Sequence, residues 1–304
     1  MMKLIAAAMF TLTAGGALAD PQQTMREDGS VIDWALDLSD GAPEGLIVLA
    51  QGSGCQPTAQ SANLDAIRAA FPGFAALRVE KYGVAPDDNP TDDHSDCSPA
   101  YYEGFTSSGR LEDYLAALAR LESADWWNGR LIVAGGSSGG EMVARIAARR
   151  KIDAGVMISS ARGVSFGEMV RASIMAEMAR HNVPPEEWPP VDEVFERARA
   201  NPDSGEIWAG HGARFWADAI DYRAMDDLLA SDAPLLLIQG GRDAGTPVAQ
   251  ARAVADGFAE AGRGNLTYWE YPALDHGLAD PEGRSHLAEV LAMAAFWVAA
   301  QPAR

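Results

Sequence analysis

Residues 131–141 could form the nucleophilic turn of a hydrolytic enzyme. Their sequence is Leu-Ile-Val-Ala-Gly-Gly-Ser-Ser-Gly-Gly-Glu, which predicts a buried strand, a sharp turn and the start of a helix. The pattern Gly-x-Ser-x-Gly occurs twice, centred on Ser137 and on Ser138. Small residues are needed two positions before and after such a serine, because a larger side chain would clash where the strand turns into the helix.

Ser137 is the better of the two candidate nucleophiles. The apolar run ends directly before Gly135, so the turn begins at once if Ser137 is at its centre. The alternative centre, Ser138, delays the turn by one residue and places Glu141 at the close contact between helix and strand. We therefore expect Ser137 to be the nucleophile and keep Ser138 as the alternative.

A serine hydroxyl needs a base to remove its proton, and histidine is the usual one because its pKa lies near the working pH. His276 follows the last predicted strand, at the sheet edge where parallel-sheet enzymes place catalytic groups. The other histidines are His94 in an acidic loop, His181 and His211 in a long insertion, and His286 in the final helix. His276 is therefore the expected base.

A carboxylate must orient this histidine. Asp243 directly follows the apolar run 235–238, at the carboxyl end of a predicted strand. Asp275 is the rival, but as the chain neighbour of His276 it is awkwardly placed to reach the ring nitrogen. The expected catalytic residues are therefore Ser137, Asp243 and His276. A lysine-based serine mechanism is excluded, because none of the three lysines stands three residues after a serine.

Apolar runs alternate with helical patterns along the chain, which predicts an α/β fold with a parallel sheet covered on both faces. The expected strands are 31–38, 45–50, 74–79, 131–134, 154–158, 235–238 and 266–271. The expected helices are 59–71, 111–121, 141–150, 247–261 and 286–300. The 72 residues of segment 161–232 exceed what one crossover helix needs, so we expect a mostly helical insertion there.

The first residues predict an export signal. Lys3, the apolar run 4–12 and the sequence Ala17-Leu18-Ala19 form its three parts, with cleavage after Ala19. The mature protein is then expected to be periplasmic or secreted, with no membrane span. In an oxidising compartment a disulfide between the two cysteines, Cys55 and Cys97, is favoured over two free thiols.

The three motifs follow one another in the order serine, aspartate, histidine, and on them the sequence resembles the α/β-hydrolase family across nearly the whole mature chain. The matching residues are Gly135-Gly136-Ser137-Ser138-Gly139-Gly140, Gly240-Gly241-Arg242-Asp243 with Pro247, and Asp275-His276-Gly277. The resemblance implies a mostly parallel sheet with helices on both faces and a helical cap after the sixth strand. The chain then divides into a signal peptide (1–19), a hydrolase core in two parts (20–160 and 233–304) and a cap (161–232).

The resemblance also implies an oxyanion hole. The family carries a His-Gly-x loop after an early strand, where this chain has Gln51-Gly52-Ser53, with glutamine in place of histidine. The backbone N–H groups of Ser53 and Ser138 are the implied donors. Each such donor is typically worth about 3 kcal/mol of transition-state stabilisation.

The net charge of −19 disfavours binding to nucleic acid or to anionic lipid by a basic patch. The same charge favours a neutral or cationic small-molecule substrate. The expected function is a serine hydrolase that cleaves a small to medium carboxylic ester through an acyl-enzyme, without cofactor or metal. The alternatives are a prolyl-oligopeptidase-like peptidase, a thioester or lactone hydrolase, and a non-catalytic binding protein on the same fold.

Overall fold

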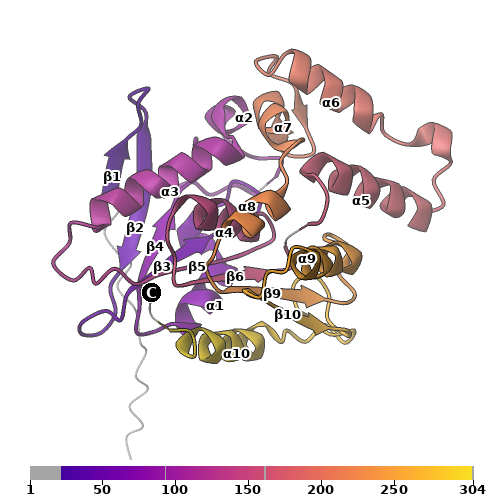
Figure 1. Ribbon diagram of the computed structural model, residues 1–304. Coiled ribbons are helices and arrows are strands. Elements are labelled where there is room, and N and C mark those ends of the chain that lie inside the picture. The colour runs from indigo at the N-terminus through magenta and orange to yellow at the C-terminus, as the bar shows by residue number, and fades with distance from the viewer. Residues whose placement is uncertain (1–21, 93, 161, 303–304) are drawn as a thin grey trace, which may run out of the picture.

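A computed structural model describes residues 22–92, 94–160 and 162–302. Within these residues eight strands form one sheet in the order β1-β2-β4-β3-β5-β6-β9-β10 (Figure 1). The strands are β1 Gln22–Met25, β2 Val31–Asp37, β3 Leu46–Ala50, β4 Ala75–Val79, β5 Leu131–Gly136, β6 Ala154–Ile158, β9 Leu235–Gly240 and β10 Leu266–Tyr271. β2 runs antiparallel to both of its neighbours, β1 and β4, at one side of the sheet. All the other neighbouring strands are parallel. The predicted mostly parallel sheet is confirmed.

Helices cover both faces of the sheet, because alternate residues of its apolar strands point to opposite sides. Ile132 and Leu236 belong to one buried cluster, and their chain neighbours Val133 and Leu237 belong to the other. The first cluster packs against α1 (Ala62–Ala70) and α10 (Leu287–Ala299). The second packs against α3 (Ser107–Leu121), α4 (Ser138–Arg149), α8 (Ala224–Ala230) and α9 (Val248–Glu260). Figure 1 shows the sheet between these two layers.

The structure corrects several expected element boundaries. β5 continues through two glycines to Gly136, and α4 already begins at Ser138, so one residue makes the turn between them. β1 was not expected, because an exposed edge strand buries neither face and shows no alternation of apolar residues. The short α2 (Pro99–Gly104) was also not expected, although Ser98 caps it by accepting the N–H of Tyr101.

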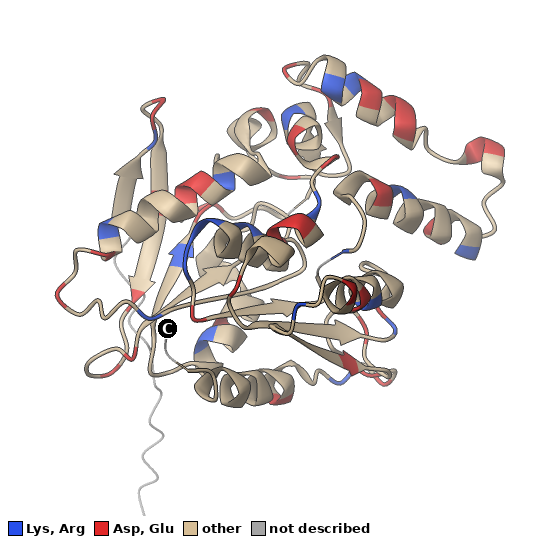
Figure 2. Ribbon diagram, in the orientation of Figure 1, with Lys and Arg blue, Asp and Glu red and all other residues tan. Residues whose placement is uncertain are grey.

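The segment between β6 and β9 is mostly helical, as the sequence suggested. It contains α5 (Phe166–Arg180), α6 (Val191–Ala200), α7 (Ala213–Ala219) and α8, together with the two-residue strands β7 (Ile207–Trp208) and β8 (His211–Gly212). Phe195, Phe215 and Trp216 pack there into an aromatic cluster. Tyr101 of α2 and Phe105, which directly follows α2, belong to the same cluster. Both acidic and basic residues lie along α5 and α6 (Figure 2), and some of them form surface ion pairs such as Arg199–Asp221 at 2.7 Å. The cap boundaries at 161 and 232 stay predictions, since α8 packs in the main core.

Cys55 and Cys97 form a disulfide, as expected from the sequence. The bond joins the loop after β3, which carries the expected oxyanion donor Ser53, to the segment that leads into α2. Both cysteines belong to the aromatic cluster of the inserted segment or pack against it. The disulfide therefore ties the oxyanion loop to the segment before α2, and both ends of the bond pack against the aromatic cluster.

We expect the double variant Cys55→Ser, Cys97→Ser to lose about 3–4 kcal/mol of unfolding free energy. The two cysteines are 42 residues apart, and a crosslink of that span removes a corresponding loop entropy from the unfolded chain. Denaturant unfolding of the purified protein, with and without reductant, measures the effect. Wild type whose unfolding midpoint does not move on reduction would contradict the prediction.

The predicted signal peptide, residues 1–19, lies outside the described residues. Within the described part of the chain, no helix combines the length and hydropathy needed to cross a membrane.

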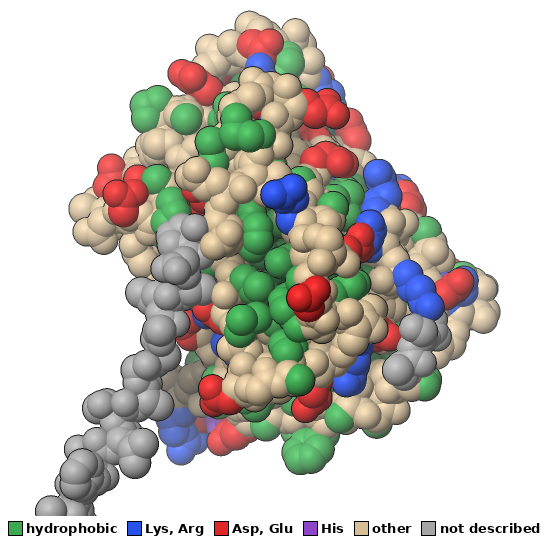
Figure 3. Space-filling model, turned by 90° about the vertical axis from the view of Figure 1, so that its left-hand side faces the viewer, with side chains coloured by type: hydrophobic (Ala, Val, Ile, Leu, Met, Phe, Trp, Pro, Cys, Tyr) green, Lys and Arg blue, Asp and Glu red, His purple; other side chains and the backbone are tan. Residues whose placement is uncertain are grey.

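On the face that carries β1, β2 and α3, hydrophobic side chains gather in a strip bordered by charged ones (Figure 3). Met25 of β1 and Val31 of β2 are among the exposed hydrophobic residues.

Candidate active site

Ser137 is the single residue between β5 and α4, and its backbone is strained. Its φ is 53° and its ψ is −127°, a region that residues with a side chain rarely adopt. Its N–H donates to the carbonyl of Ile158 in the neighbouring strand at 2.9 Å, which holds the residue at the sheet edge. Strain of this kind persists only where surrounding structure imposes it, and it is typical of a nucleophile elbow.

Glycines surround Ser137 because the helix starts within contact distance of the strands. A Cβ on Gly139 would lie 2.0 Å from the carbonyl oxygen of Ala50, and a Cβ on Gly135 would lie 2.6 Å from Gly139. These are the positions two before and two after Ser137. Ser138 is already the first residue of α4, with Ser137 as the N-cap residue. The geometry therefore favours Ser137 over Ser138 as the nucleophile.

His276 and Asp243 lie together at the carboxyl ends of β10 and β9. Nδ1 of His276 is 2.9 Å from each carboxylate oxygen of Asp243. The carboxylate also accepts the Thr246 N–H at 2.7 Å and Nε2 of Gln239 at 2.8 Å. The Asp243 side chain is 0% exposed and that of His276 is 41% exposed. A buried, fixed carboxylate thus orients a ring that stays accessible.

The hydrogen bond from His276 to Asp243 raises the pKa of His276 above its ordinary value, and the charges of Asp243 and Asp275 act in the same direction. Burial of the ring opposes this shift. Asp275 does not compete for Nδ1, because its Oδ1 accepts the N–H groups of Gly277 and Ala279 at 2.9 Å. Nδ1 is occupied by Asp243, so Nε2 is the ring nitrogen left to serve as a base.

Ser137 and His276 line the same two cavities. The larger, which we name the acyl cavity, has a volume of about 190 Å³ and is also lined by Ser53 and Ser138. The smaller has a volume of about 120 Å³ and is lined mainly by apolar residues such as Leu64 and Ile158. Among the described residues no hydrogen bond joins the Ser137 hydroxyl to the ring of His276. Such bonds are often long without substrate.

The oxyanion loop is held by buried charged residues that no sequence motif indicated. Nζ of Lys81 donates to the side-chain oxygen of Gln51 at 3.0 Å and also to the carbonyl of Gly54. Arg110 donates to the carbonyl of Gln51 at 2.8 Å. The glutamine that replaces the family's histidine thus has defined partners, since its amide also donates to the Gln56 carbonyl at 2.8 Å.

The other histidines have different surroundings. His211, from β8, lines the acyl cavity and is 3.2 Å from the Tyr101 hydroxyl. Burial lowers the pKa of His211 to about 3, so this ring is neutral at physiological pH. His94, His181 and His286 contact Ser53, Glu177 and the pair Asp280 and Glu289, respectively. Across the described residues, no group of three or more His, Cys, Asp or Glu side chains is arranged to hold a metal.

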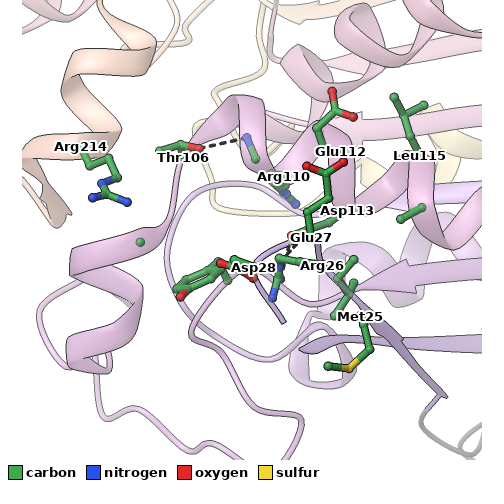
Figure 4. A pocket seen from close by; sticks show the side chains of 15 residues that line it. Met25, Arg26, Glu27, Asp28, Thr106, Arg110, Glu112, Asp113, Leu115 and Arg214 are labelled. Carbon is green, nitrogen blue, oxygen red and sulfur yellow. Dashed lines mark hydrogen bonds and ion pairs between the residues drawn. The ribbon is translucent and has the colours of Figure 1, made fainter. Parts of the chain in front are cut away.

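A larger cavity, of about 680 Å³, is lined by neither Ser137 nor His276 (Figure 4). Residues of β1, β2 and α3 form much of its wall, and Arg214 approaches from α7. Arg26 points towards Asp113 there and makes two hydrogen bonds of 2.7 and 2.8 Å with its carboxylate. Because Arg26 and Asp113 neutralise each other and neither Ser137 nor a histidine is in the lining, we assign this cavity no catalytic role.

The sheet order, the helices on both faces and the turn at Ser137 define the α/β-hydrolase fold. Comparison with solved structures agrees with this assignment. Est1E of Butyrivibrio proteoclasticus with ferulic acid bound is 20% identical, with a TM-score of 0.63 over 92% of this chain and 100% of that chain. An esterase of Pyrococcus furiosus is 14% identical, with a TM-score of 0.58 over 97% and 92%. The acylaminoacyl peptidase of Pyrococcus horikoshii is 13% identical, with a TM-score of 0.60 over 94% of this chain and 42% of that one.

No protein-family model matches the sequence, and no curated protein does. The predicted α/β-hydrolase fold is confirmed by the structural likeness. At these identities the likeness establishes the fold alone, and the function must be argued from the site.

Proposed function

We propose that this protein is a serine hydrolase that cleaves a carboxylic ester. The observation that carries the proposal is the strained Ser137, which faces the same cavities as a histidine paired with a buried aspartate. A serine in this conformation presents its hydroxyl at the tip of a tight turn. A paired histidine supplies the base that this hydroxyl needs.

In the proposed reaction Oγ of Ser137 attacks the ester carbonyl while Nε2 of His276 takes the hydroxyl proton. Collapse of the tetrahedral intermediate breaks the bond to the alcohol oxygen, which receives that proton from His276. Water then attacks the acyl-enzyme with His276 again as the base, and the carboxylic acid leaves with Ser137 restored. Asp243 holds the ring and stabilises its protonated form.

The backbone N–H groups of Ser53 and Ser138 are the proposed oxyanion donors. Both residues line the acyl cavity together with Ser137, whereas neither lines the smaller cavity. Lys81 and Arg110 act as positioning residues, because they hold the loop that carries Ser53. Donors fixed in advance stabilise the developing charge without further reorganisation.

The cavity size supports a small acyl group. A volume of about 190 Å³ corresponds to roughly six water molecules and is smaller than the roughly 300–1,000 Å³ of drug-sized sites. Phe166, Met169 and Phe215 from the inserted segment give it an apolar wall. We therefore propose a short acyl chain.

The disulfide and the predicted signal peptide support a periplasmic or secreted location.

A peptidase is the second candidate, since the P. horikoshii acylaminoacyl peptidase shares the fold. A peptidase that binds a free amino terminus needs a carboxylate available to hold the substrate amine. Glu141 is the sole carboxylate among the described residues that line the acyl cavity, and Arg145 and Arg162 already bind it. Glu168 caps α5, and Glu186 and Glu187 are exposed on the inserted segment. These contacts favour the esterase over the peptidase.

A substrate panel tests the proposal. We expect hydrolysis of p-nitrophenyl acetate and butyrate, weaker hydrolysis of the octanoate, and kcat/KM for alanyl p-nitroanilide at least about 100-fold lower than for the esters. Anilide cleavage as efficient as ester cleavage would establish the peptidase instead. Failure both to hydrolyse the panel and to react with a fluorophosphonate would favour a non-catalytic binding protein.

A further inference from the structure

The acyl cavity contains two buried guanidinium groups that make no direct contact with the reacting atoms in the proposed ester hydrolysis. Arg110 and Arg162 both line it, and their residues are only 3% and 4% exposed. They reach it from separate elements, since Arg110 lies on α3 and Arg162 lies between β6 and α5. A chain with a net charge of −19 thus places two guanidinium groups beside its candidate nucleophile.

Hydrogen bonds within the protein use only some of the N–H donors of these two guanidinium groups. Arg162 donates from Nη1 to Glu141 at 2.9 Å, and Arg110 donates from Nη2 to the carbonyl of Gln51 at 2.8 Å and to the Tyr114 hydroxyl at 3.3 Å. The buried Nε of each arginine has no hydrogen-bond partner among the described residues. Leaving a buried donor of a charged group without a partner costs free energy, so the protein alone does not fully compensate the burial of these two charges.

The charges around the cavity do not cancel. Glu141 is the one described carboxylate in the lining, and it also accepts from Arg145 at 3.3 Å, so two guanidinium groups share it. His211 adds no charge because burial holds its pKa at about 3. The charge of His276, when it is protonated, is paired with Asp243. The lining therefore keeps an excess of positive charge.

We propose that the substrate carries a carboxylate on its acyl part, bound by Arg162 together with Arg110, so that the enzyme cleaves monoesters of short dicarboxylic acids. This inference rests on the proposed ester hydrolysis. Guanidinium binds carboxylate with paired, charge-assisted hydrogen bonds, which are strongest in a desolvated site. Phe166 and Phe215 would contact the short methylene chain between the carboxylate and the ester. The acyl part is assigned to this cavity because both proposed oxyanion donors line it.

Two matched esters test the inference. Mono-p-nitrophenyl glutarate and p-nitrophenyl pentanoate have acyl chains of equal length, and they differ in a terminal carboxylate against a methyl group. We expect wild type to favour the glutarate by about tenfold or more in kcat/KM, and Arg162→Gln to lower this ratio by about 30-fold. Arg162→Lys, which keeps the charge but loses the paired donors, should restore part of the ratio.

Arg145→Gln is the matched control. It removes a guanidinium from the same Glu141 but from outside the cavity lining. We expect it to change the glutarate-to-pentanoate ratio far less than Arg162→Gln does. An equal loss of ratio in both variants, or a wild type that favours the pentanoate, would overturn the inference while leaving ester hydrolysis in place.

Binding to Ser137→Ala separates this inference from the proposed function. Calorimetry with monomethyl glutarate and methyl pentanoate, which this variant cannot cleave by the proposed route, should show tighter binding of the glutarate. The preference should disappear in the double variant Ser137→Ala, Arg162→Gln. If the protein binds the glutarate more tightly but the wild type hydrolyses no ester, the proposed anion site stands and the proposed esterase activity is rejected. Equal binding of the two compounds would reject the anion site.

Discussion

Ser137→Ala is expected to lower kcat for ester hydrolysis by about 10⁵- to 10⁶-fold. The hydroxyl of Ser137 forms the proposed acyl-enzyme. In the alanine variant a water molecule would have to replace this nucleophile, and it would be neither as reactive nor as well positioned. The backbone conformation at position 137 is imposed by close contacts of Gly135 and Gly139 with their neighbours, so the alanine variant should keep the fold. Rates with p-nitrophenyl butyrate and labelling by a fluorophosphonate measure the loss.

Ser138→Ala is the matched control for this result. It removes an adjacent hydroxyl that lines the same cavity but keeps the backbone N–H of the proposed oxyanion hole. We expect less than about a tenfold loss of kcat and unchanged labelling. Labelling that persists in Ser137→Ala and vanishes in Ser138→Ala would make Ser138 the nucleophile.

Asp243→Asn is expected to lower kcat by about 10⁴-fold at neutral pH. Asparagine presents an amide N–H to His276 and so favours the tautomer in which the base nitrogen is already protonated. The substitution also removes the charge that stabilises the imidazolium. Its matched control is Asp275→Asn, which should cost less than about tenfold, because Asp275 binds backbone N–H groups and not the ring. Equal losses in the two variants would contradict the assignment of Asp243.

The pH dependence of wild type gives a second measurement on the same pair. His276 must be neutral to accept the Ser137 proton, so kcat/KM should fall as the pH drops through the pKa of His276. The hydrogen bond to Asp243 raises that pKa above the ordinary 6.5, and the acid limb of the profile should therefore have its midpoint above pH 6.5. In Asp243→Asn the residual activity should show this midpoint moved to lower pH. An unmoved midpoint would mean that the limb reports a different group.

The sequence predicted most of the central strands because a strand buried on both faces is a continuous apolar run. The run in β6, Ala154–Ile158, was predicted with its observed bounds for this reason. β9 extends to Gly240 beyond its predicted end, because its polar and glycine residues continue the pairing with β10. The register of an exposed edge strand such as β1 depends on its partner β2, which no local pattern reveals.

Local chemistry also let the sequence alone indicate the candidate nucleophile. The tight turn at Ser137 needs glycines at fixed spacing. Because these glycines are close to Ser137 in the sequence, the motif can be recognised without the structure. The choice between Asp243 and Asp275 depended on which of the two carboxylates reaches the ring of His276 in the folded protein. The structure shows Asp243 at the ring and Asp275 in its own turn.

The charge of the acyl cavity was decided by tertiary structure alone. From the sequence, a net charge of −19 favoured neutral or cationic substrates, because a sum over the chain measures only the long-range field. Arg110, Glu141 and Arg162 come from three separate segments and meet only when α3, α4 and the loop after β6 pack together. Short-range charge depends on which side chains share a cavity, and packing between distant segments determines that.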